Sequence, residues 1–272
     1  MRHLTIPVRT KELHIYPICD VQMGGKGVDL RGFQEHIDDA MADPLARFIG
    51  VGDYTDGVSP SNRKLLKAAF DKGELYDTPN EMLTDSAKRQ VHDFLDIVAP
   101  TRGKWDFLVS GHHYWEYVVN KTIRTTDDDI AEFLGCPSLG DESVVANYVW
   151  KGKPRPFRLW ARHGEGSGVS FAAPLNQLER QMRGFTADAY VIGHHHKLVA
   201  AGAVKLDEAP EAETQLAATD SRLVAAGSWM HGFLPNESTY AEKGMMVPLA
   251  TGAPIIFVTK RDDGTFKVRT LI

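Results

Sequence analysis

Short apolar runs alternate with longer segments of helical periodicity along most of this chain. Each run is followed within two residues by glycine, aspartate or histidine. Each is too short for a helix but fits a buried strand. We therefore expect strands at residues 13–19, 48–51, 107–110, 157–161 and 189–192.

Between these runs, apolar residues recur at the spacing of a helix face. Asp29 and Asn80 are suited to cap two of the helices, and Pro100 is suited to end the third. Strands that alternate with helices predict an α/β architecture, with ligands bound beyond the carboxyl ends of the strands. The expected helices span residues 29–42, 62–72, 80–98 and 174–185.

The last part of the chain has a different pattern, because few helices separate its strands. Asp262, Asp263 and Gly264 form a hairpin signal between the last two strands. This pattern predicts a second, more antiparallel sheet, and the acidic, alanine-rich residues 208–220 are expected to form an exposed loop. The expected strands span residues 144–151, 197–206, 223–228, 255–260 and 266–271.

Composition narrows the class of protein. The chain has 272 residues, 43% hydrophobic and 25% charged, so we expect one globular domain over residues 1–272. No run reaches the roughly 20 apolar residues of a membrane span, and no secretory signal is evident, which predicts a cytoplasmic protein with no membrane partner.

Cys19 and Cys136 are expected to be free thiols. The net charge of −5 argues against broad electrostatic capture of nucleic acid.

Five segments at the expected strand ends carry an unusual share of side chains that bind metals. Six of the eleven histidines fall in the last three segments. We expect all five segments to lie at the ends of strands of one sheet. They are residues 19–22, 52–57, 110–113, 162–164 and 192–196.

Carboxylate and imidazole ligands together suit Mn, Fe and Zn. Two such metals about 3.5–4 Å apart can share a bridging carboxylate and hold a hydroxide that attacks a phosphoryl group. Glycines beside the ligands permit tight turns and a close approach of backbone to substrate. Each segment taken singly also fits an ordinary turn or a solvated loop, so it is the ordered series that indicates a metal site.

In its order, the series resembles the calcineurin-like metallophosphoesterase family. The family pattern is Asp-x-His, Gly-Asp-x-x-Asp, Gly-Asn-His-Asp/Glu, a lone His often followed by Gly, and Gly-His-x-His. The resemblance runs from Asp20 to His196, and its closest matches are residues 52–57 and 193–196. More loosely, residues 239–244 and 248–249 resemble the C-terminal part of phosphoesterases carried by bacteriophages and prophages.

The resemblance implies a four-layer αββα sandwich, in which two mixed sheets pack face to face with helices outside. It also implies two divalent metal ions at one edge, with Mn²⁺ preferred and Fe, Zn, Ni and Mg as alternatives. His113 would lie over the scissile phosphate, and Asp56 would orient His113. The implied metal ligands are Asp53 for both ions, Asp20, Gln22 and His196 for one ion, and His112, His163 and His194 for the other.

Three positions depart from the family pattern. Gln22 stands where the family has histidine, and its carboxamide oxygen favours Mn²⁺ or Mg²⁺ over late first-row metals. His112 stands where the family has asparagine. Because His112 and His113 are adjacent, their two roles could be exchanged. Tyr114 occupies the position of the acid that follows in the family.

We therefore expect a metal-dependent phosphoesterase that uses a metal-bound hydroxide. The expected substrate is a phosphate ester, preferably a phosphodiester of the nucleotide or nucleic-acid type, and this preference rests on the phage-like resemblance alone. Two alternatives remain open. One is a single-metal hydrolase of carboxylic esters or amides that uses His112, His163 and His194. The other is a binding scaffold that has lost catalysis, for which Gln22 and His112 are substitutions of the expected kind.

Overall fold

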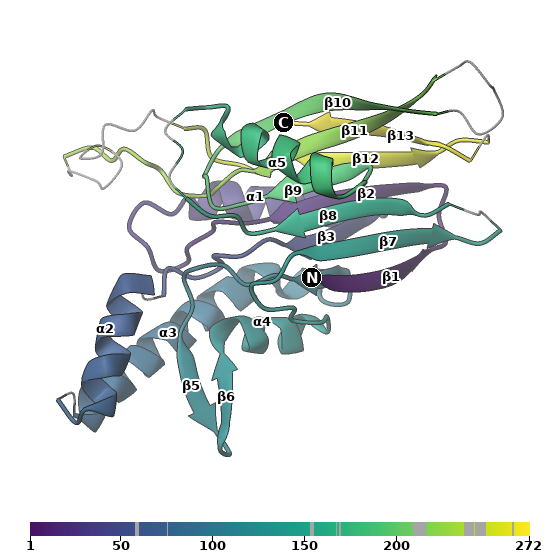
Figure 1. The fold of residues 1–272 in the computed structure, drawn as a ribbon. Coiled ribbons are helices and arrows are strands. Elements are labelled where there is room, and N and C mark those ends of the chain that lie inside the picture. The colour runs from purple at the N-terminus through teal and green to yellow at the C-terminus, as the bar shows by residue number, and fades with distance from the viewer. Residues whose placement is uncertain are drawn as a thin grey trace.

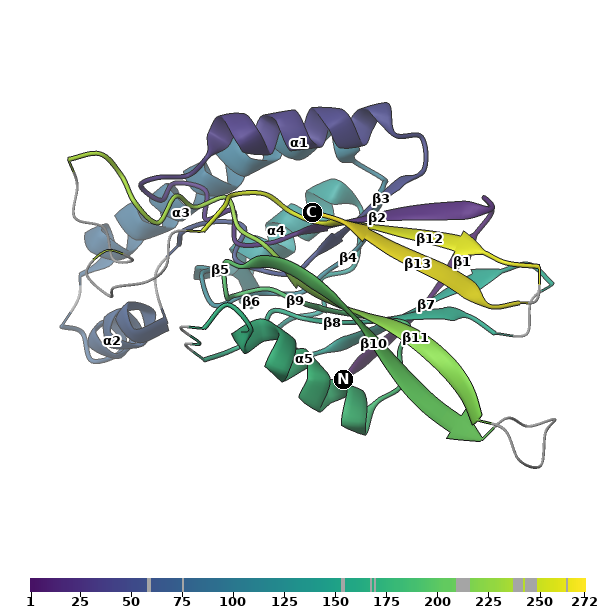
Figure 2. The same ribbon diagram turned by 90° about the horizontal axis from the view of Figure 1, so that it is seen from above.

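The computed structural model contains two large sheets packed face to face, with helices on their outer faces (Figures 1 and 2). This arrangement confirms the predicted αββα sandwich. The structure describes residues 1–57, 60–74, 76–152, 155–166, 168, 170–208, 216–236, 242, 249–262 and 264–272.

Both sheets are mixed. The five-stranded sheet has the order β13-β12-β2-β3-β4, and β2, β3 and β4 run parallel. The six-stranded sheet has the order β1-β7-β8-β9-β11-β10, and β8, β9 and β11 run parallel. The first sheet contains β2 (Glu12–Ile18), β3 (Ala46–Gly50), β4 (Trp105–Leu108), β12 (Ile255–Lys260) and β13 (Phe266–Leu271). The second contains β1 (Arg2–Val8), β7 (Val144–Trp150), β8 (Phe157–Arg162), β9 (Ala189–Ile192), β10 (Leu198–Glu208) and β11 (Leu216–Ala226).

Helices α1 (Leu30–Ala42), α3 (Asp77–Val98) and α4 (Thr126–Leu134) cover the five-stranded sheet, and α5 (Ala173–Gly184) covers the six-stranded sheet (Figure 2). The 3₁₀ turn η1 (Ala99–Thr101) follows α3 directly. Helix α2 (Pro60–Asp71) and the hairpin of β5 (Glu116–Val119) and β6 (Thr122–Thr125) lie at one end of the sandwich (Figure 1). Lys67 of α2 forms an ion pair with Glu116 of β5 at 2.8 Å, and Lys88 of α3 lies over the ring of Tyr117 of β5.

Three buried clusters join these layers. Ile49 and Val191 belong to the cluster between the two sheets. Phe33 packs beneath α1 on the five-stranded sheet, and Leu178 packs beneath α5 on the six-stranded sheet. Strands such as β2, β3 and β9 are covered on both faces, which explains why their sequences are apolar runs and do not alternate with polar residues.

Two of the three predicted helix signals are confirmed. The Asp29 Oδ1 atom accepts a 3.0 Å hydrogen bond from the Gly32 backbone N–H, which caps α1. Helix α3 ends at Val98, before Pro100. Asn80 as a cap is wrong, because α3 begins earlier, at Asp77. An acidic residue in the first turn interacts favourably with the helix dipole, so Asp77 stabilises this earlier start.

The predicted partition of strands between the sheets is wrong. Strands β12 and β13 return to the first sheet, where β12 pairs antiparallel with β2, whereas β8 and β9 belong to the other sheet with β7. Residues 216–220 form part of β11 and not of an exposed loop. Pairing between distant strands is a tertiary choice that a local sequence pattern does not specify. The prediction also missed β1, the β5–β6 hairpin and α4.

Some predicted features lie outside the described residues. Residues 239–244 and 248–249, which carry the phage-like resemblance, are described only at Glu242 and Leu249. Asp263 is also outside, although the β12–β13 hairpin predicted around it is confirmed. None of the helices in the described ranges has the length and apolar character needed to span a bilayer.

A buried hydrogen bond joins the two sheets and gives a test of their packing. The Tyr148 hydroxyl of β7 donates to Asp106 Oδ2 of β4 at 2.9 Å. We expect Tyr148→Phe to lower the free energy of unfolding by about 1–3 kcal/mol, because it leaves a buried carboxylate oxygen without a donor. Tyr16→Phe is the control, since Asp43 would keep its contacts with His14 and the Leu45 N–H. Equal losses in urea denaturation would contradict this account.

Candidate metal centre

The five predicted segments follow β2, β3, β4, β8 and β9. The first three strands belong to one sheet and the last two to the other, so the expectation that all five strands share a sheet is wrong. Parallel strands place their carboxyl ends at the same edge of a sheet. The two sheets present these edges at the same end of the sandwich, and the candidate centre lies between them.

The backbone at these loops is unusual. Eight described residues other than glycine have a positive φ. Such conformations cost about 1–3 kcal/mol each and collect at functional sites. Five of the eight are predicted ligands, namely Asp20 (49°), Gln22 (48°), Asp53 (55°), His194 (67°) and His196 (52°).

Asp53 lies at the middle of the centre and is only 1% exposed. Its Oδ1 atom accepts hydrogen bonds from the backbone N–H groups of His112, at 2.5 Å, and His113, at 2.9 Å. Its Oδ2 atom lies 3.2 Å from Nε2 of His163. Burial alone would raise the pKa of the Asp53 carboxyl, but His163 and His113 hold that pKa well below its usual range. Asp53 is therefore ionised.

His163 is buried opposite Asp53. Its Nδ1 donates to the Val51 carbonyl oxygen at 2.7 Å, so Nε2 is the nitrogen directed at the centre. Burial lowers the pKa of a histidine, but the carboxylates of Asp53 and Asp20 overcome this and raise the pKa of His163 to about 9. Without a cation, the His163 imidazolium thus supplies the positive charge that balances Asp53.

His112 and His194 face each other. Their Nδ1 atoms lie 3.2 Å apart, and Nε2 of His194 donates to the Gly166 carbonyl oxygen at 3.1 Å. Burial, together with the charge of nearby His163, lowers the pKa of both rings. The neutral ring of His194 therefore directs the lone pair of Nδ1 towards His112, and neutral imidazole is the form that binds metals.

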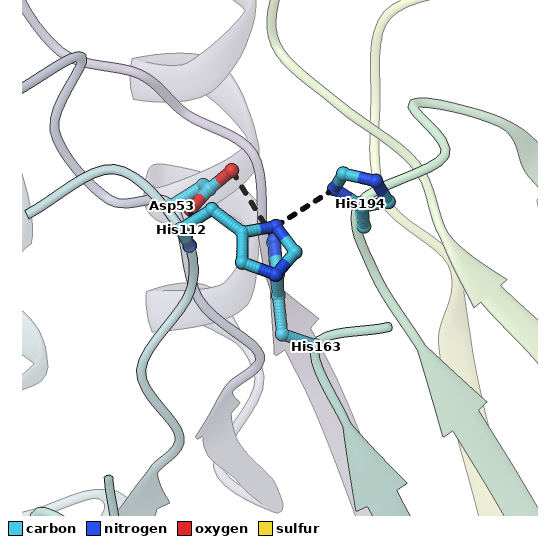
Figure 3. Close-up of side chains that lie close together, drawn as sticks. All are labelled: Asp53, His112, His163 and His194. Carbon is cyan, nitrogen blue, oxygen red and sulfur yellow. Dashed lines mark hydrogen bonds and ion pairs between the residues drawn. The ribbon is translucent and has the colours of Figure 1, made fainter. Parts of the chain in front are cut away.

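Asp53, His112, His163 and His194 together form a set whose ligand atoms all lie within 4.8 Å of one another (Figure 3). This set matches the ligands predicted for one of the two ions. Carboxylate and imidazole donors suit first-row divalent metals. The geometry therefore fits a cation, while the ligand role of each residue stays a prediction.

The remaining predicted ligands lie beside this set. Asp20 is fully buried, and its Oδ1 lies 3.4 Å from Nε2 of His196. Its Oδ2 accepts from the His194 N–H at 2.8 Å and from the Cys19 thiol at 2.8 Å. The Gln22 backbone N–H donates to the Asp53 carbonyl oxygen at 3.0 Å, which holds Gln22 against the same loop.

Two buried polar atoms without a hydrogen-bond partner support the binding of cations at the candidate centre. Asp20 Oδ1 and His163 Nε2 are both inaccessible, and neither makes a hydrogen bond of normal geometry with any described residue. Buried polar atoms usually have a partner. Divalent cations in the two predicted sets would satisfy these atoms, Asp20 Oδ1 in one set and His163 Nε2 in the other, since a carboxylate oxygen and an imidazole nitrogen both bind such metals.

The predicted pair of His113 and Asp56 is adjacent, but its contact differs from the expected one. Nδ1 of His113 donates to the backbone carbonyl oxygen of Asp56 at 2.6 Å, and the Asp56 carboxylate is not the acceptor. Burial raises the pKa of the Asp56 carboxyl, against the opposing effect of His113 and with a further increase from the charge of Asp53. The backbone of Asp56 therefore sets the orientation of His113.

Several groups that hold the ligands were not predicted from the sequence. Val51 and Gly166 act through backbone carbonyls, which carry no residue-specific signal. Ser228 contacts Asp20 and His196 although it follows them in the sequence by 208 and 32 residues. Arg63 of α2 donates to the carbonyl oxygens of His112, at 3.0 Å, and Tyr114, at 2.7 Å, and stacks on the Tyr114 ring.

The comparisons with known proteins add little to this geometry. No family model matches the chain, and a search of curated proteins found no match either. Among solved structures, a single mutant, a double mutant and the Zn²⁺ complex of wild-type Vps29 from Entamoeba histolytica match at 13% identity. Each covers 96% of this chain and 98% of Vps29, with TM-scores of 0.38, 0.35 and 0.36. At these scores the likeness supports neither an activity nor a ligand for this chain.

Gly111 provides a steric test of the centre. A Cβ atom there would overlap the Asp53 side chain and backbone nitrogen. We expect Gly111→Ala to lower the free energy of unfolding by about 1–3 kcal/mol, since overpacking forces neighbours to shift. Gly184→Ala is the matched control, because its Cβ would meet nothing within 4 Å. If denaturant unfolding showed no difference between the two variants, the close packing of Gly111 on Asp53 would be wrong.

Proposed function

We propose that this protein is a metal-dependent phosphoesterase. The observation that carries the proposal is the set of ligand atoms of Asp53, His112, His163 and His194, gathered within 4.8 Å from loops of both sheets. The motif order from Asp20 to His196, which resembles calcineurin-like metallophosphoesterases, directs the proposal towards phosphate esters.

In this proposal two ligand sets share Asp53. One set adds Asp20, Gln22 and His196, and the other adds His112, His163 and His194. When bound, divalent cations supply Lewis-acid polarisation of the phosphoryl group and neutralise developing charge. Mn²⁺ is the preferred ion, because a carboxamide ligand such as Gln22 suits harder cations than a second imidazole beside His196 would.

His113 is the proposed acid. Its Nδ1 is engaged by the Asp56 carbonyl at 2.6 Å, so Nε2 is the nitrogen that can give a proton to the leaving oxygen or donate to a phosphoryl oxygen. His113 is held in place from both sides, because its backbone N–H also donates to Asp53 at 2.9 Å. A phosphodiester of the nucleotide or nucleic-acid type is the proposed substrate, on the phage-like resemblance alone.

One specific observation favours a second candidate. The set of Asp53, His112, His163 and His194 contains the three imidazoles, of His112, His163 and His194, that a single-metal hydrolase of carboxylic esters or amides would use as ligands. Metal content separates the candidates. About two equivalents of Mn²⁺ per chain support the phosphoesterase, and one equivalent without phosphatase activity supports the alternative.

The direct test is hydrolysis of bis-p-nitrophenyl phosphate and p-nitrophenyl phosphate with Mn²⁺ and with chelator. We expect turnover that requires Mn²⁺, and we expect Asp53→Asn to abolish it and to weaken all metal binding, because Asp53 would serve both ions. Asp188→Asn is the matched control: Asp188 is equally buried but lies at the opposite end of β9 from His194. Activity that survived in Asp53→Asn would contradict the proposal.

Replacing His113 separates catalysis from metal binding. We expect His113→Ala to keep its metal content while turnover falls by about 10²–10⁴-fold, the usual contribution of a general acid. His112→Ala is the paired variant, and it should lose metal. Metal analysis and initial rates are measured on both. The opposite result, with metal lost from His113→Ala and retained in His112→Ala, would exchange the two roles.

A further inference from the structure

Ser228 is a buried side chain that joins two of the proposed ligands. It follows β11 and is 2% exposed. Its backbone exchanges hydrogen bonds with Gly252, at 3.1 and 2.8 Å, which fixes its position. Its Oγ atom lies 3.0 Å from the carbonyl oxygen of Asp20, 3.2 Å from Nδ1 of His196 and 3.1 Å from the backbone nitrogen of Met230.

The hydrogen bonds of this hydroxyl can be assigned by counting donors and acceptors. A serine hydroxyl has one proton to donate and two lone pairs. The Asp20 carbonyl can only accept, so it receives the Ser228 proton. The Met230 N–H can only donate, so it takes one lone pair. The second lone pair remains for His196, whose Nδ1 must therefore carry a hydrogen.

This assignment determines which nitrogen of His196 is available to a metal. With the hydrogen on Nδ1, a neutral ring presents the lone pair of Nε2, and Nε2 is the atom that lies 3.4 Å from Asp20 Oδ1. The same hydroxyl also holds the carbonyl of Asp20, whose backbone has the uncommon φ of 49°. Ser228 therefore acts on both residues at once.

We infer that Ser228 is a positioning residue that fixes the ring tautomer of His196, and that it thereby sets the metal affinity of the Asp20–His196 site. The inference rests on the proposed function for its metal part. His163 and His194 are oriented by the backbone carbonyls of Val51 and Gly166. The support for His196 comes from a side chain and can be removed by substitution.

The test compares Ser228→Ala with Ser221→Ala. Ser221 lies on β11, is 1% exposed and donates to the Ala187 carbonyl at 2.9 Å away from the centre, so both variants lose one buried hydroxyl. The first readout is the ¹⁵N shifts of the histidine rings in metal-free protein, at a pH where His196 is neutral. We expect the Nδ1–H tautomer in wild type and Ser221→Ala, and a mixture of tautomers in Ser228→Ala.

The second readout is calorimetric titration with Mn²⁺ alone. We expect Ser228→Ala to weaken one of two Mn²⁺ sites by about 10–100-fold, the usual effect of removing a group that supports a ligand, and to leave the other site unchanged. Ser228→Thr, which keeps the hydroxyl, should restore both the tautomer and the affinity. An Nδ1–H tautomer and wild-type affinity in Ser228→Ala would overturn the inference.

The two readouts also separate this inference from the proposed function. The tautomer is measured without metal or substrate, so it reports on Ser228 even if wild type cleaves no phosphate ester. A wild type that bound Mn²⁺ without turnover would remove the proposed function and leave the inference standing. A wild type that bound no Mn²⁺ would overturn the metal part, whatever the tautomer.

Discussion

Asp53 lies almost fully buried between the ends of two sheets, where an ionised carboxylate is costly unless donors and charges surround it. The compensation comes from both sheets. The backbone N–H groups of His112 and His113 approach from the loop after β4, and the His163 ring approaches from the loop after β8. The arrangement of the centre depends on this carboxylate, because removing it would leave His163 buried without its main counter-charge.

Hydrogen-bond acceptors around three histidine rings determine which nitrogen of each ring faces the candidate metal centre. Carbonyl oxygens of Val51 and Gly166, together with the Ser228 hydroxyl, accept from the outer nitrogens of three histidines. Each ring is then left with one nitrogen facing the carboxylates or its neighbour. The left-handed backbone at five predicted ligands is held by the same loops, so the sandwich supports the strain that this geometry requires.

The alternation of apolar runs and helical segments predicted an α/β architecture, and the family resemblance implied the αββα layers. The convergence of the metal-binding segments was predicted because loops at the carboxyl ends of parallel strands meet at one edge, although these strands belong to two sheets. It did not predict that β12 would pair with β2, since that choice depends on distant residues. It also did not predict the role of the Asp56 carbonyl or of Ser228. Any residue type can supply a backbone carbonyl, and Ser228 is separated from His196 by β10 and β11, so the local sequence gives no sign of their contact.

The most direct measurement is anomalous diffraction from crystals of the protein soaked in Mn²⁺. We expect two anomalous peaks about 3.5–4 Å apart, both within bonding distance of Asp53. One peak would lie against Asp20 and His196, and the other against His112, His163 and His194. A map with no peak at Asp53, or with a single peak and nothing beside Asp20, would contradict a centre built on one shared carboxylate.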